Sequence, residues 1–350
     1  MEKFTYGSVC SGVEAATVAW DPLGWSPAWL CEFDAFPSAV LKHHFPNVPN
    51  LDDMTKIEER PEYNDRTINL LVGGTPCQSF SIAGLRKGLD DERGNLAFKY
   101  CQILKEKRPR WFVWENVPGV LSNNGGQDFA AILSGFRECG YGFAYRIFNA
   151  KHFGVPQGRR RLFVVGHIAD WRPAAAVLFE RDSLRGNIKT GDQTRQGFTP
   201  APTDCARKRY KPIVLDRAAY NQGENAQFDP MIEETETAPA LVARGPCAVL
   251  TYRMQAFGEY VEDETASTIK NRDHKDSTDL IVEWDKVRRL TPIECERLQG
   301  FPDEWTNIPW KGKLTSPDSL RYKAMGNSMA VPVMRWIGER IKTMDELLNN

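Results

Sequence analysis

Residues 68–78 read INLLVGGTPCQ, and this stretch decides the fold. Its first five residues form a mostly apolar run, and Gly73, Gly74 and Pro76 break that run immediately afterwards. Short apolar runs bounded by turn residues are typical of buried strands in parallel sheets. In open α/β sheets, the loops that leave the carboxyl ends of the strands line the ligand crevice. The stretch therefore predicts a buried strand that delivers Cys77 to the edge of a binding site.

Cys77 has two interpretations. A free cysteine is more often a small buried hydrophobic residue than a reactive group. The neighbours of Cys77 favour reactivity, because turn-forming residues precede it and the polar residues Gln78, Ser79 and Ser81 follow it. We therefore interpret Cys77 as a candidate nucleophile on a loop.

Strand-like and helix-like segments alternate from residue 1 to about residue 172. Strands are expected at 4–9, 28–31, 68–72, 111–114 and 162–165, and helices are expected at 14–20, 35–44 and 129–139. Strands that alternate with helices predict an α/β fold with a doubly wound, mostly parallel sheet. Helical patterns return near the end of the chain, at 291–299 and 332–348.

The chain between about 173 and 285 has a different composition. It is rich in Thr, Pro, Asn and Asp, it carries short strand-like pieces, and it has no long helical period. We interpret this part as a separate, smaller, loop-rich domain. Basic residues concentrate between 181 and 217, although such a stretch is more often a solvated surface than a binding site.

The overall composition excludes several classes of protein. With 350 residues and 41% hydrophobic residues, the chain can bury a large core. No apolar run approaches ~18 residues and the N-terminus lacks the features of a signal peptide, so we expect a cytoplasmic protein without membrane contact. The eight cysteines form no CxxC pair and the five histidines form no HExxH motif, so neither a metal site nor a disulfide framework is expected. A net charge of −1 means that any nucleic-acid binding must use local basic patches.

The first two expected strands indicate a nucleotide-type pocket. In a Rossmann-type domain, a glycine-containing turn follows the first strand and an acidic residue ends the second. Ser11-Gly12 and Glu32 occupy these positions. The turn reads CSGVEAA instead of GxGxxG, and Glu14 is placed where a phosphate would lie. This argues against NAD and for a ligand without phosphates, such as S-adenosylmethionine, whose adenine amino group Asp53 could hold.

Three further stretches place polar groups at the ends of expected elements. Glu115 comes at the carboxyl end of a strand, although such a residue alone is more often a helix cap or a surface group. Arg159 and Arg161 precede another strand, and alternation points both guanidiniums to one face, where they suit an anionic or carbonyl-rich substrate. An ordinary basic turn is the alternative. The turn Gly326-Asn327-Ser328 precedes the last helix and offers backbone amides to a ligand.

Taken in order, these stretches resemble the motifs of the C5-cytosine-specific DNA methyltransferase family, of the bacterial or phage type. The matching positions are the SGVEAA turn, Glu32, Asp53, Pro76-Cys77-Gln78, Glu115-Asn116-Val117, Gln157 with Arg159 and Arg161, RLTP at 289–292 with ERLQGFP at 296–302, and Gly326-Asn327-Ser328. They cover nearly the whole chain except about 173–285. The first turn departs from the family, because Cys10 stands where an aromatic residue is usual and Glu14-Ala15 where Gly-Gly is frequent.

The resemblance implies a Rossmann-like, S-adenosylmethionine-dependent methyltransferase fold with a smaller target-recognition domain. Residues 1–172 would form the catalytic and cofactor-binding domain, 173–315 the target-recognition domain, and 316–350 a C-terminal segment that returns to the catalytic domain. The implied partner is double-stranded DNA, bound by a monomer. The sequence does not show which site is methylated or whether a cognate restriction endonuclease exists.

The resemblance also implies which residues form the site. The catalytic residues would be Cys77, Glu115, Arg159 and Arg161. The residues that bind S-adenosylmethionine would be Cys10, Ser11, Gly12, Glu32, Phe33, Asp53, Met54, Pro76, Leu96, Asn327 and Ser328. Contacts with DNA would come from Gln78, Ser81, Gln157, Thr268 and Ile269. No metal is implied.

The implied chemistry is covalent. The Cys77 thiolate would add to C6 of a cytosine, so that C5 becomes nucleophilic enough to take the sulfonium methyl. Glu115 would hold N3 and the 4-amino group, while Arg159 and Arg161 would hold the cytosine carbonyl and the adjacent phosphate. Because stacked neighbours block C6, the base must be flipped out of the duplex. The glycine-containing stretch 79–95 has the composition of a lid that could close over it.

Three alternatives remain at this point. An RNA cytosine-5 methyltransferase would share the pocket, although the large variable segment fits the reading of duplex DNA better. A non-catalytic DNA-binding relative would be favoured if Cys77, Glu115 or Arg159 were missing, and all three are present. A Rossmann oxidoreductase is disfavoured because GxGxxG is missing.

Overall fold

The computed structural model describes residues 3–76, 96–179 and 286–349. Between 179 and 286 it describes Ile269 and five strands, at 213–215, 232–234, 250–256, 259–262 and 279–283. None of the helices in these ranges has both the length and the apolar character needed to cross a membrane.

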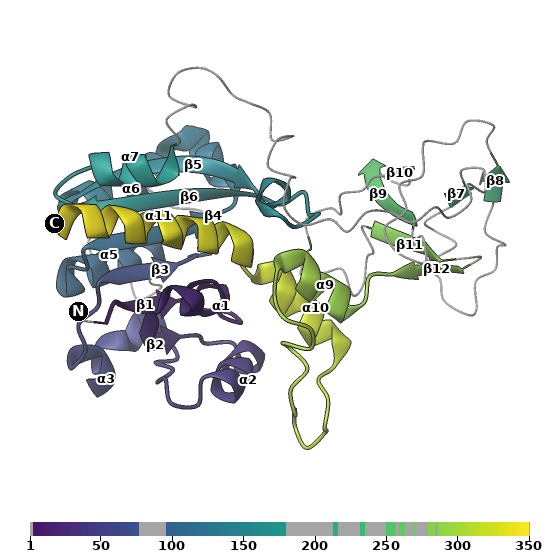
Figure 1. The fold of residues 1–350 in the computed structure, drawn as a ribbon, viewed down its shortest axis with the longest axis horizontal. Helices are drawn as coiled ribbons and strands as arrows, with labels where there is room; N and C mark the ends of the chain where they lie inside the picture. Colours follow the sequence, from purple (N-terminus) through teal and green to yellow (C-terminus); the bar gives the residue numbers. More distant parts are fainter. Residues whose placement is uncertain are drawn as a thin grey trace.

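A six-stranded sheet forms the centre of the larger part of the molecule (Figure 1). Its strands are β1 (Thr5–Val9), β2 (Ser26–Cys31), β3 (Leu70–Gly73), β4 (Trp111–Asn116), β5 (Tyr141–Asn149) and β6 (Arg160–Ile168), in the order β2-β1-β3-β4-β6-β5. The first four strands in this order are parallel, whereas β4 pairs with β6 and β6 with β5 in antiparallel fashion. The predicted α/β fold with a mostly parallel, doubly wound sheet is confirmed. The antiparallel edge was not predicted, because the sequence patterns did not identify β5.

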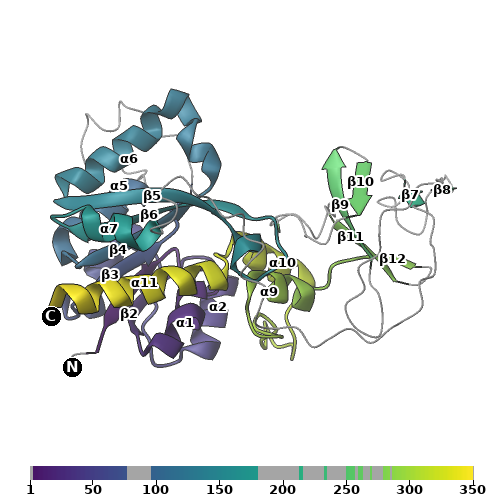
Figure 2. The same ribbon diagram turned by 45° about the horizontal axis from the view of Figure 1, so that its top comes forward.

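Helices cover both faces of this sheet. They are α1 (Ala15–Trp20), α2 (Ala35–His44), α3 (Pro61–Asn64), α5 (Leu96–Lys107), α6 (Gln127–Glu138), α7 (Arg172–Leu178) and α11 (Val331–Asn349). Short 3-10 helices are found at Asp21–Leu23, Met54–Glu59, Pro118–Leu121, Asn123–Gly126 and Ala150–Phe153. In Figure 2 the sheet lies between α5 and α6 on one side and α1 and α11 on the other.

The sequence of the strands explains why both faces are covered. Side chains alternate between the two faces of a strand, so a continuous apolar run supplies both faces. Leu70 and Val72 of β3 belong to the core cluster that contains α1, α7 and α11, while Leu71 belongs to the cluster that contains α5 and α6. In the same way, Trp111 and Val113 of β4 join the first cluster, and Phe112 and Trp114 join the second.

The C-terminal helix α11 completes the core against the N-terminal helix α1. Its residues Val333, Met334, Ile337 and Ile341 are buried, and Trp20 donates a hydrogen bond from Nε1 to the Met334 carbonyl at 2.7 Å. The Trp20 ring packs so closely on Gly338 that a Cβ at that position would overlap it. The two ends of the chain therefore meet on one face of the sheet.

The second region contains two further sheets. Strands β9 (Leu250–Ala256), β10 (Glu259–Glu262), β11 (Asp279–Glu283) and β12 (Lys286–Arg289) form an antiparallel sheet in the order β10-β9-β11-β12. Strands β7 (Ile213–Leu215) and β8 (Ile232–Glu234) form an antiparallel pair. These strands are short, and they lie to one side of the six-stranded sheet (Figure 1).

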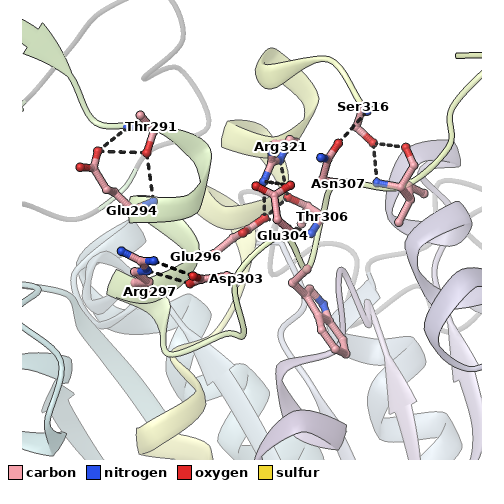
Figure 3. A network of polar contacts seen from close by, with 12 residues as sticks. Thr291, Glu294, Glu296, Arg297, Asp303, Glu304, Thr306, Asn307, Ser316 and Arg321 are labelled. Atoms are coloured by element: carbon pink, nitrogen blue, oxygen red, sulfur yellow. Dashed lines mark hydrogen bonds and ion pairs between the residues drawn. The ribbon is translucent and has the colours of Figure 1, made fainter. Parts of the chain in front are cut away.

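Helices α9 (Pro292–Gln299) and α10 (Asp318–Asn327) lie between the six-stranded sheet and strands β9–β12 (Figure 1). Thr291 begins α9 with a capping box, in which its side chain and that of Glu294 satisfy each other's backbone amides. A buried ion pair joins the two helices, since Arg321 Nη2 lies 3.0 Å from Glu296 Oε1, and Thr306 also donates to Glu296 (Figure 3).

The stretch from α9 to Trp310 packs with the six-stranded sheet. Leu298 and Phe301 belong to the same core cluster as α1 and α11, and so do the buried side chains of α7. Trp305 donates from Nε1 to the Val13 carbonyl at 3.0 Å, and its ring stacks on His44 at 3.6 Å. We therefore propose narrower limits for the second region than the expected 173–315, because α7 and α9 both complete the core of the six-stranded sheet.

Candidate active site

A cavity of about 650 Å³ opens at the carboxyl ends of the parallel strands. Such a volume suits a nucleoside-sized ligand together with a second group beside it. Its walls come from the turns after β1, β2, β3 and β4, from the start of β6, and from α10. The residues that line it include Cys10, Gly12, Glu32, Phe33, Asp53, Met54, Pro76, Leu96, Glu115, Arg159, Arg161 and Asn327. The cavity thus brings together residues that the sequence analysis placed in one site.

The turn after β1 is closed by Glu32. The amide of Gly12 donates to Glu32 Oε2 at 2.7 Å, and the amide of Asp34 donates to Glu32 Oε1 at 2.8 Å. Burial raises the pKa of Glu32. A phosphate at this turn would compete with a carboxylate for the same amide, so the turn suits a ligand without phosphates. Each carboxylate oxygen can accept a further hydrogen bond, for example from a ribose hydroxyl.

Glu14 does not face the cavity, which corrects the argument that it would repel a phosphate there. Its side chain turns inward and is 1% exposed. It accepts hydrogen bonds from Ser8 Oγ at 2.8 Å, from the Thr17 amide at 3.1 Å and from Thr17 Oγ1 at 3.0 Å. Burial raises the pKa of Glu14 to about 7. Glu14 caps α1, and the exclusion of a phosphate comes from Glu32 instead.

The other predicted cofactor residues near β1 and β2 divide into two groups. Cys10, Phe33, Asp53 and Met54 line the cavity, and Phe33 presents its ring with 79% exposure. Ser11 does not line it. Its hydroxyl accepts from the Cys31 amide at 3.0 Å and donates to the Ser8 carbonyl at 3.0 Å, so it joins the ends of the two strands.

Glu115 and Arg161 form an ion pair on the wall of the cavity. Arg161 Nε lies 3.1 Å from Glu115 Oε1, and the two side chains are 16% and 12% exposed. Burial raises the pKa of Glu115, while the positive charges of Arg161 and Arg159 act in the opposite direction. A Cβ at Gly74 would lie 2.8 Å from Glu115 Oε2, so a glycine is needed where the turn after β3 passes this carboxylate. Burial thus favours the acid form of this carboxyl group, and the neighbouring cation favours its carboxylate form.

Two residues that the sequence analysis did not assign hold the chain that leads to Cys77. Asn116 donates from Nδ2 to the Thr75 carbonyl at 2.9 Å, and Trp114 donates from Nε1 to Thr75 Oγ1 at 3.0 Å. Asn116 directly follows Glu115 in the Glu-Asn-Val motif, so the sequence could have identified it as a residue of the site. These contacts tie the end of β4 to the segment that enters Pro76.

Arg159 lies at the same wall, but its hydrogen bonds go to the backbone. It donates to the carbonyls of Ile269 at 3.3 Å, Gly326 at 3.1 Å and Ser328 at 2.6 Å. Burial lowers the pKa of Arg159 to about 9, so the group is still charged at neutral pH. The sequence analysis paired Arg159 with Arg161 as a substrate contact, and the structure separates their contacts.

The segment Gly326-Asn327-Ser328, expected as a turn before the last helix, is the last turn of α10, with Ser328 as its C-cap. Gly326 and Asn327 line the cavity. Ser328 is 5% exposed and does not line it; its backbone carbonyl accepts from Arg159. Cofactor binding by Ser328 stays a prediction.

Two residues expected to contact DNA are buried. Gln157 is fully buried and donates from Nε2 to the Leu298 carbonyl at 3.3 Å. Ile269 is 2% exposed, and its side chain packs in the core cluster of α1 and α11. Neither side chain can meet a base edge in this structure, because apolar and backbone groups surround it. Cys77, Gln78, Ser81 and Thr268 lie outside the described residues.

No group of three or more His, Cys, Asp or Glu side chains suitable for a metal ion is found among the described residues.

The comparisons with known proteins identify the family and the fold. The family described as C-5 cytosine-specific DNA methylase matches residues 4–343. The type II methyltransferase M.HpaII of Haemophilus parainfluenzae is 30% identical over 344 residues, which are 97% of this chain and 89% of that protein. The S. pombe Dnmt2 methyltransferase structure covers 99% of this chain and 100% of its own, with a TM-score of 0.62 and 16% identity, and so supports the fold.

Another relative carries a different name. A protein of Escherichia phage P1 named DNA N-6-adenine-methyltransferase is 37% identical over 480 residues. The match takes in 97% of this chain but only 61% of the phage protein, so the chain spans less than two thirds of that relative. Because the family model extends over nearly the whole chain and M.HpaII is similar over the same length, this chain belongs to the C-5 cytosine-specific DNA methylases, a family of enzymes.

Proposed function

We propose that this chain transfers a methyl group from S-adenosylmethionine to C5 of a flipped-out cytosine in a specific duplex DNA sequence, through a covalent bond between Cys77 and C6. The observation that carries the proposal is the Glu115–Arg161 ion pair on the cavity wall, next to the segment that runs through Pro76 into Cys77. A protonatable carboxyl group beside a fixed cation suits the recognition of a neutral base whose ring nitrogen must take up a proton.

The cavity fits S-adenosylmethionine. Glu32 lies where it can accept from ribose hydroxyls, and the exposed Phe33 ring offers a face for an adenine. Asp53 and Asn327 also line the cavity, and Asp53 could accept a hydrogen bond from the adenine amino group. When bound, the cofactor would supply a methyl group on a positively charged sulfur. No metal takes part in the proposed reaction.

Cys77 would supply the nucleophile. A thiol has a pKa near ~8.5, so a neighbouring positive charge is needed to favour the thiolate. Arg161 is a cation on the wall of the same cavity. Addition of the Cys77 sulfur to C6 pushes electron density to C5 and N3 of the cytosine. After the transfer, the C5 proton leaves to a base such as water, and the Cys77–C6 bond breaks.

Glu115 would move a proton at N3. As the sulfur adds to C6, negative charge develops at N3, and a protonated carboxyl group can neutralise it by donating its proton. The burial that raises the pKa of Glu115 keeps the acid form available at higher pH. Arg161 would orient Glu115 and hold the cytosine carbonyl oxygen.

Strands β9–β12, which lie between α7 and α9 in the sequence, would read the DNA sequence. They lie to one side of the six-stranded sheet (Figure 1), and DNA bound there could present an extruded base to the cavity. Because α7 packs in the core of the six-stranded sheet, we propose that the recognition region spans residues 180–290. The proposal also includes a monomeric protein and, where the host carries one, a cognate restriction endonuclease.

The proposal is tested by the modified bases in DNA from cells that express the chain. Nucleoside mass spectrometry should detect 5-methylcytosine above the level of cells without the chain, and bisulfite sequencing should place it in one short sequence. The name of the phage P1 relative makes N6-methyladenine the second candidate product, and the same measurement detects it. N6-methyladenine without 5-methylcytosine would overturn the proposal. Methyl transfer to purified DNA and to purified tRNA, measured under the same conditions, distinguishes a DNA methyltransferase from an RNA methyltransferase.

Exchanging residues 180–290 for the matching region of another family member should change which sequence is methylated. The expected result is a new bisulfite pattern in a chain that still transfers methyl groups, because the cavity residues, α7 and α9 stay in place. An exchange of 173–315, the range expected from the sequence, is the matched comparison, and it should lower stability because it replaces the buried side chains of α7 and α9. An unchanged pattern in a folded 180–290 exchange would contradict the assignment of the recognition region.

A further inference from the structure

Arg159 joins three parts of the chain. Its side chain is 2% exposed, and its guanidinium donates three hydrogen bonds, all of them to backbone carbonyls. One acceptor is Ile269, which belongs by sequence to the region proposed to read DNA, while its side chain packs in the core of the six-stranded sheet. The other two, Gly326 and Ser328, lie on either side of Asn327 in the turn that lines the cavity. Arg159 itself belongs to the connection between β5 and β6, in the catalytic part.

Gly326 and Asn327 are held within the last turn of helix α10, and the Ser328 amide donates to the Met325 carbonyl at 3.2 Å. Two side chains from other elements, Arg159 and a glutamine, add to this support. Gln299 of α9 is fully buried and donates from Nε2 to the Met325 carbonyl at 2.7 Å and, more weakly, to the Ser328 carbonyl at 3.5 Å. Both side chains therefore bind backbone carbonyls of this turn. Of the two, Arg159 also donates to the Ile269 carbonyl, so its guanidinium links a movement of Ile269 to the turn.

Arg159 and Arg161 consequently have different tasks. Arg161 pairs with Glu115 at 3.1 Å and points its charge at the base-binding wall. The Nη atoms of Arg159 are taken up by carbonyls, and its Nε has no partner among the described residues. A guanidinium can hold several carbonyls at fixed angles, which an ammonium cannot do.

We infer that Arg159 is a positioning residue that couples DNA binding at the recognition region to cofactor binding at the Asn327 turn. The inference rests on the proposed function. DNA binding that restrains the Ile269 carbonyl also restrains the last turn of α10 through Arg159. Cofactor binding at this turn restrains Ile269 through the same side chain. Thermodynamic linkage then requires each ligand to raise the affinity for the other by one and the same factor.

The coupling is measured without turnover, with S-adenosylhomocysteine and a labelled duplex that carries the methylated sequence. In the wild-type chain, S-adenosylhomocysteine should tighten duplex binding in fluorescence anisotropy by about fivefold or more, and the duplex should tighten S-adenosylhomocysteine binding in calorimetry equally. In Arg159→Lys, which keeps the charge but not the planar group, both factors should fall to about one. Arg159→Lys with the wild-type factor would overturn the inference, and so would a wild-type chain without coupling.

Two controls separate the link from charge and from the turn. Arg160 is exposed and adjacent in sequence, so Arg160→Gln removes one positive charge and should leave the coupling factor unchanged even if DNA binding weakens. Gln299→Ala removes support from the turn without touching Ile269, and it should weaken S-adenosylhomocysteine binding with and without DNA alike. Loss of coupling in Arg160→Gln would assign the effect to charge and overturn the role of Arg159.

Hydrogen exchange on the wild-type chain tests the same link if Arg159→Lys does not fold. Duplex alone, without S-adenosylhomocysteine, should slow amide exchange in a peptide that contains Gly326–Ser328. Unchanged exchange there, with slowed exchange around Ile269, would overturn the inference. A chain that leaves no 5-methylcytosine in DNA contradicts the proposed function, whereas a chain that methylates DNA without coupling contradicts only the role of Arg159.

Discussion

A Cys77→Ser chain is expected to leave no detectable 5-methylcytosine in DNA while it keeps its affinity for S-adenosylmethionine. A serine hydroxyl is not ionised near neutral pH and adds poorly to C6, so the rate should fall on the order of 10⁴-fold or more. Single-turnover transfer of a labelled methyl group measures the loss, and calorimetry with S-adenosylmethionine measures the retained binding.

Cys139 supplies the matched control for this substitution. It does not line the cavity, and it lies between α6 and β5. Cys139→Ser should therefore methylate DNA at the wild-type rate. Duplex containing 5-fluorocytosine should form a stable adduct with the wild-type and Cys139→Ser chains and none with Cys77→Ser. Methylation by Cys77→Ser at a substantial rate would show that another group is the nucleophile.

A Glu115→Gln chain is expected to transfer the methyl group on the order of 10²-fold more slowly or worse, because an amide cannot donate a proton to N3. The amide has nearly the same shape, so S-adenosylmethionine binding should stay close to that of the wild type. Glu138→Gln makes the same change at an exposed position of α6 and should leave the rate unaltered. A wild-type rate in Glu115→Gln would remove Glu115 from the proton transfer.

The pH dependence of the two chains gives a second test of Glu115. Burial raises the pKa of this carboxyl group, so its acid form persists to higher pH than in an exposed glutamate and is lost as the pH rises through that pKa. The wild-type transfer rate should therefore fall on the alkaline side. Glu115→Gln should lack this alkaline fall and keep the fall at low pH that comes from protonation of Cys77. A single-turnover rate profile from pH 5 to pH 10 distinguishes the two limbs.

The parallel strands were the most predictable elements of the fold. Residues 70–73 and 111–114 are all buried. Because helices cover both faces of the sheet, side chains that point to either face must be apolar there. Strand β5 was missed for the opposite reason. Most of its side chains are only partly buried, since it lies at the edge of the sheet, so its pattern contrasts little with a loop. Helix α5 was also missed, although its sequence carries a helical pattern: the buried positions 97, 100, 101, 103 and 104 recur at intervals of three to four residues.

The residues of the cavity were predictable as types at strand ends, but their contacts were not. Alternation correctly places Arg159 and Arg161 near one another, yet it cannot show that one meets a carboxylate and the other meets three carbonyls. Those carbonyls belong to residues more than a hundred positions away in the sequence. Glu14 shows the same limit, because a left-handed backbone with φ of 65° turns its side chain into the core. The order of the motifs identifies the site, and long-range packing decides what each side chain does there.

The packing of α11 against α1 has a consequence for folding during synthesis on the ribosome. Helix α11 completes the apolar face of the sheet against Trp20, and the wall formed by Asn327 lies just before it. Contacts between such distant residues close slowly, and they can form only after the final stretch has been translated. We therefore expect nascent chains that stop before α11 to lack methyl-transfer activity, so that activity begins only after this helix has been synthesised.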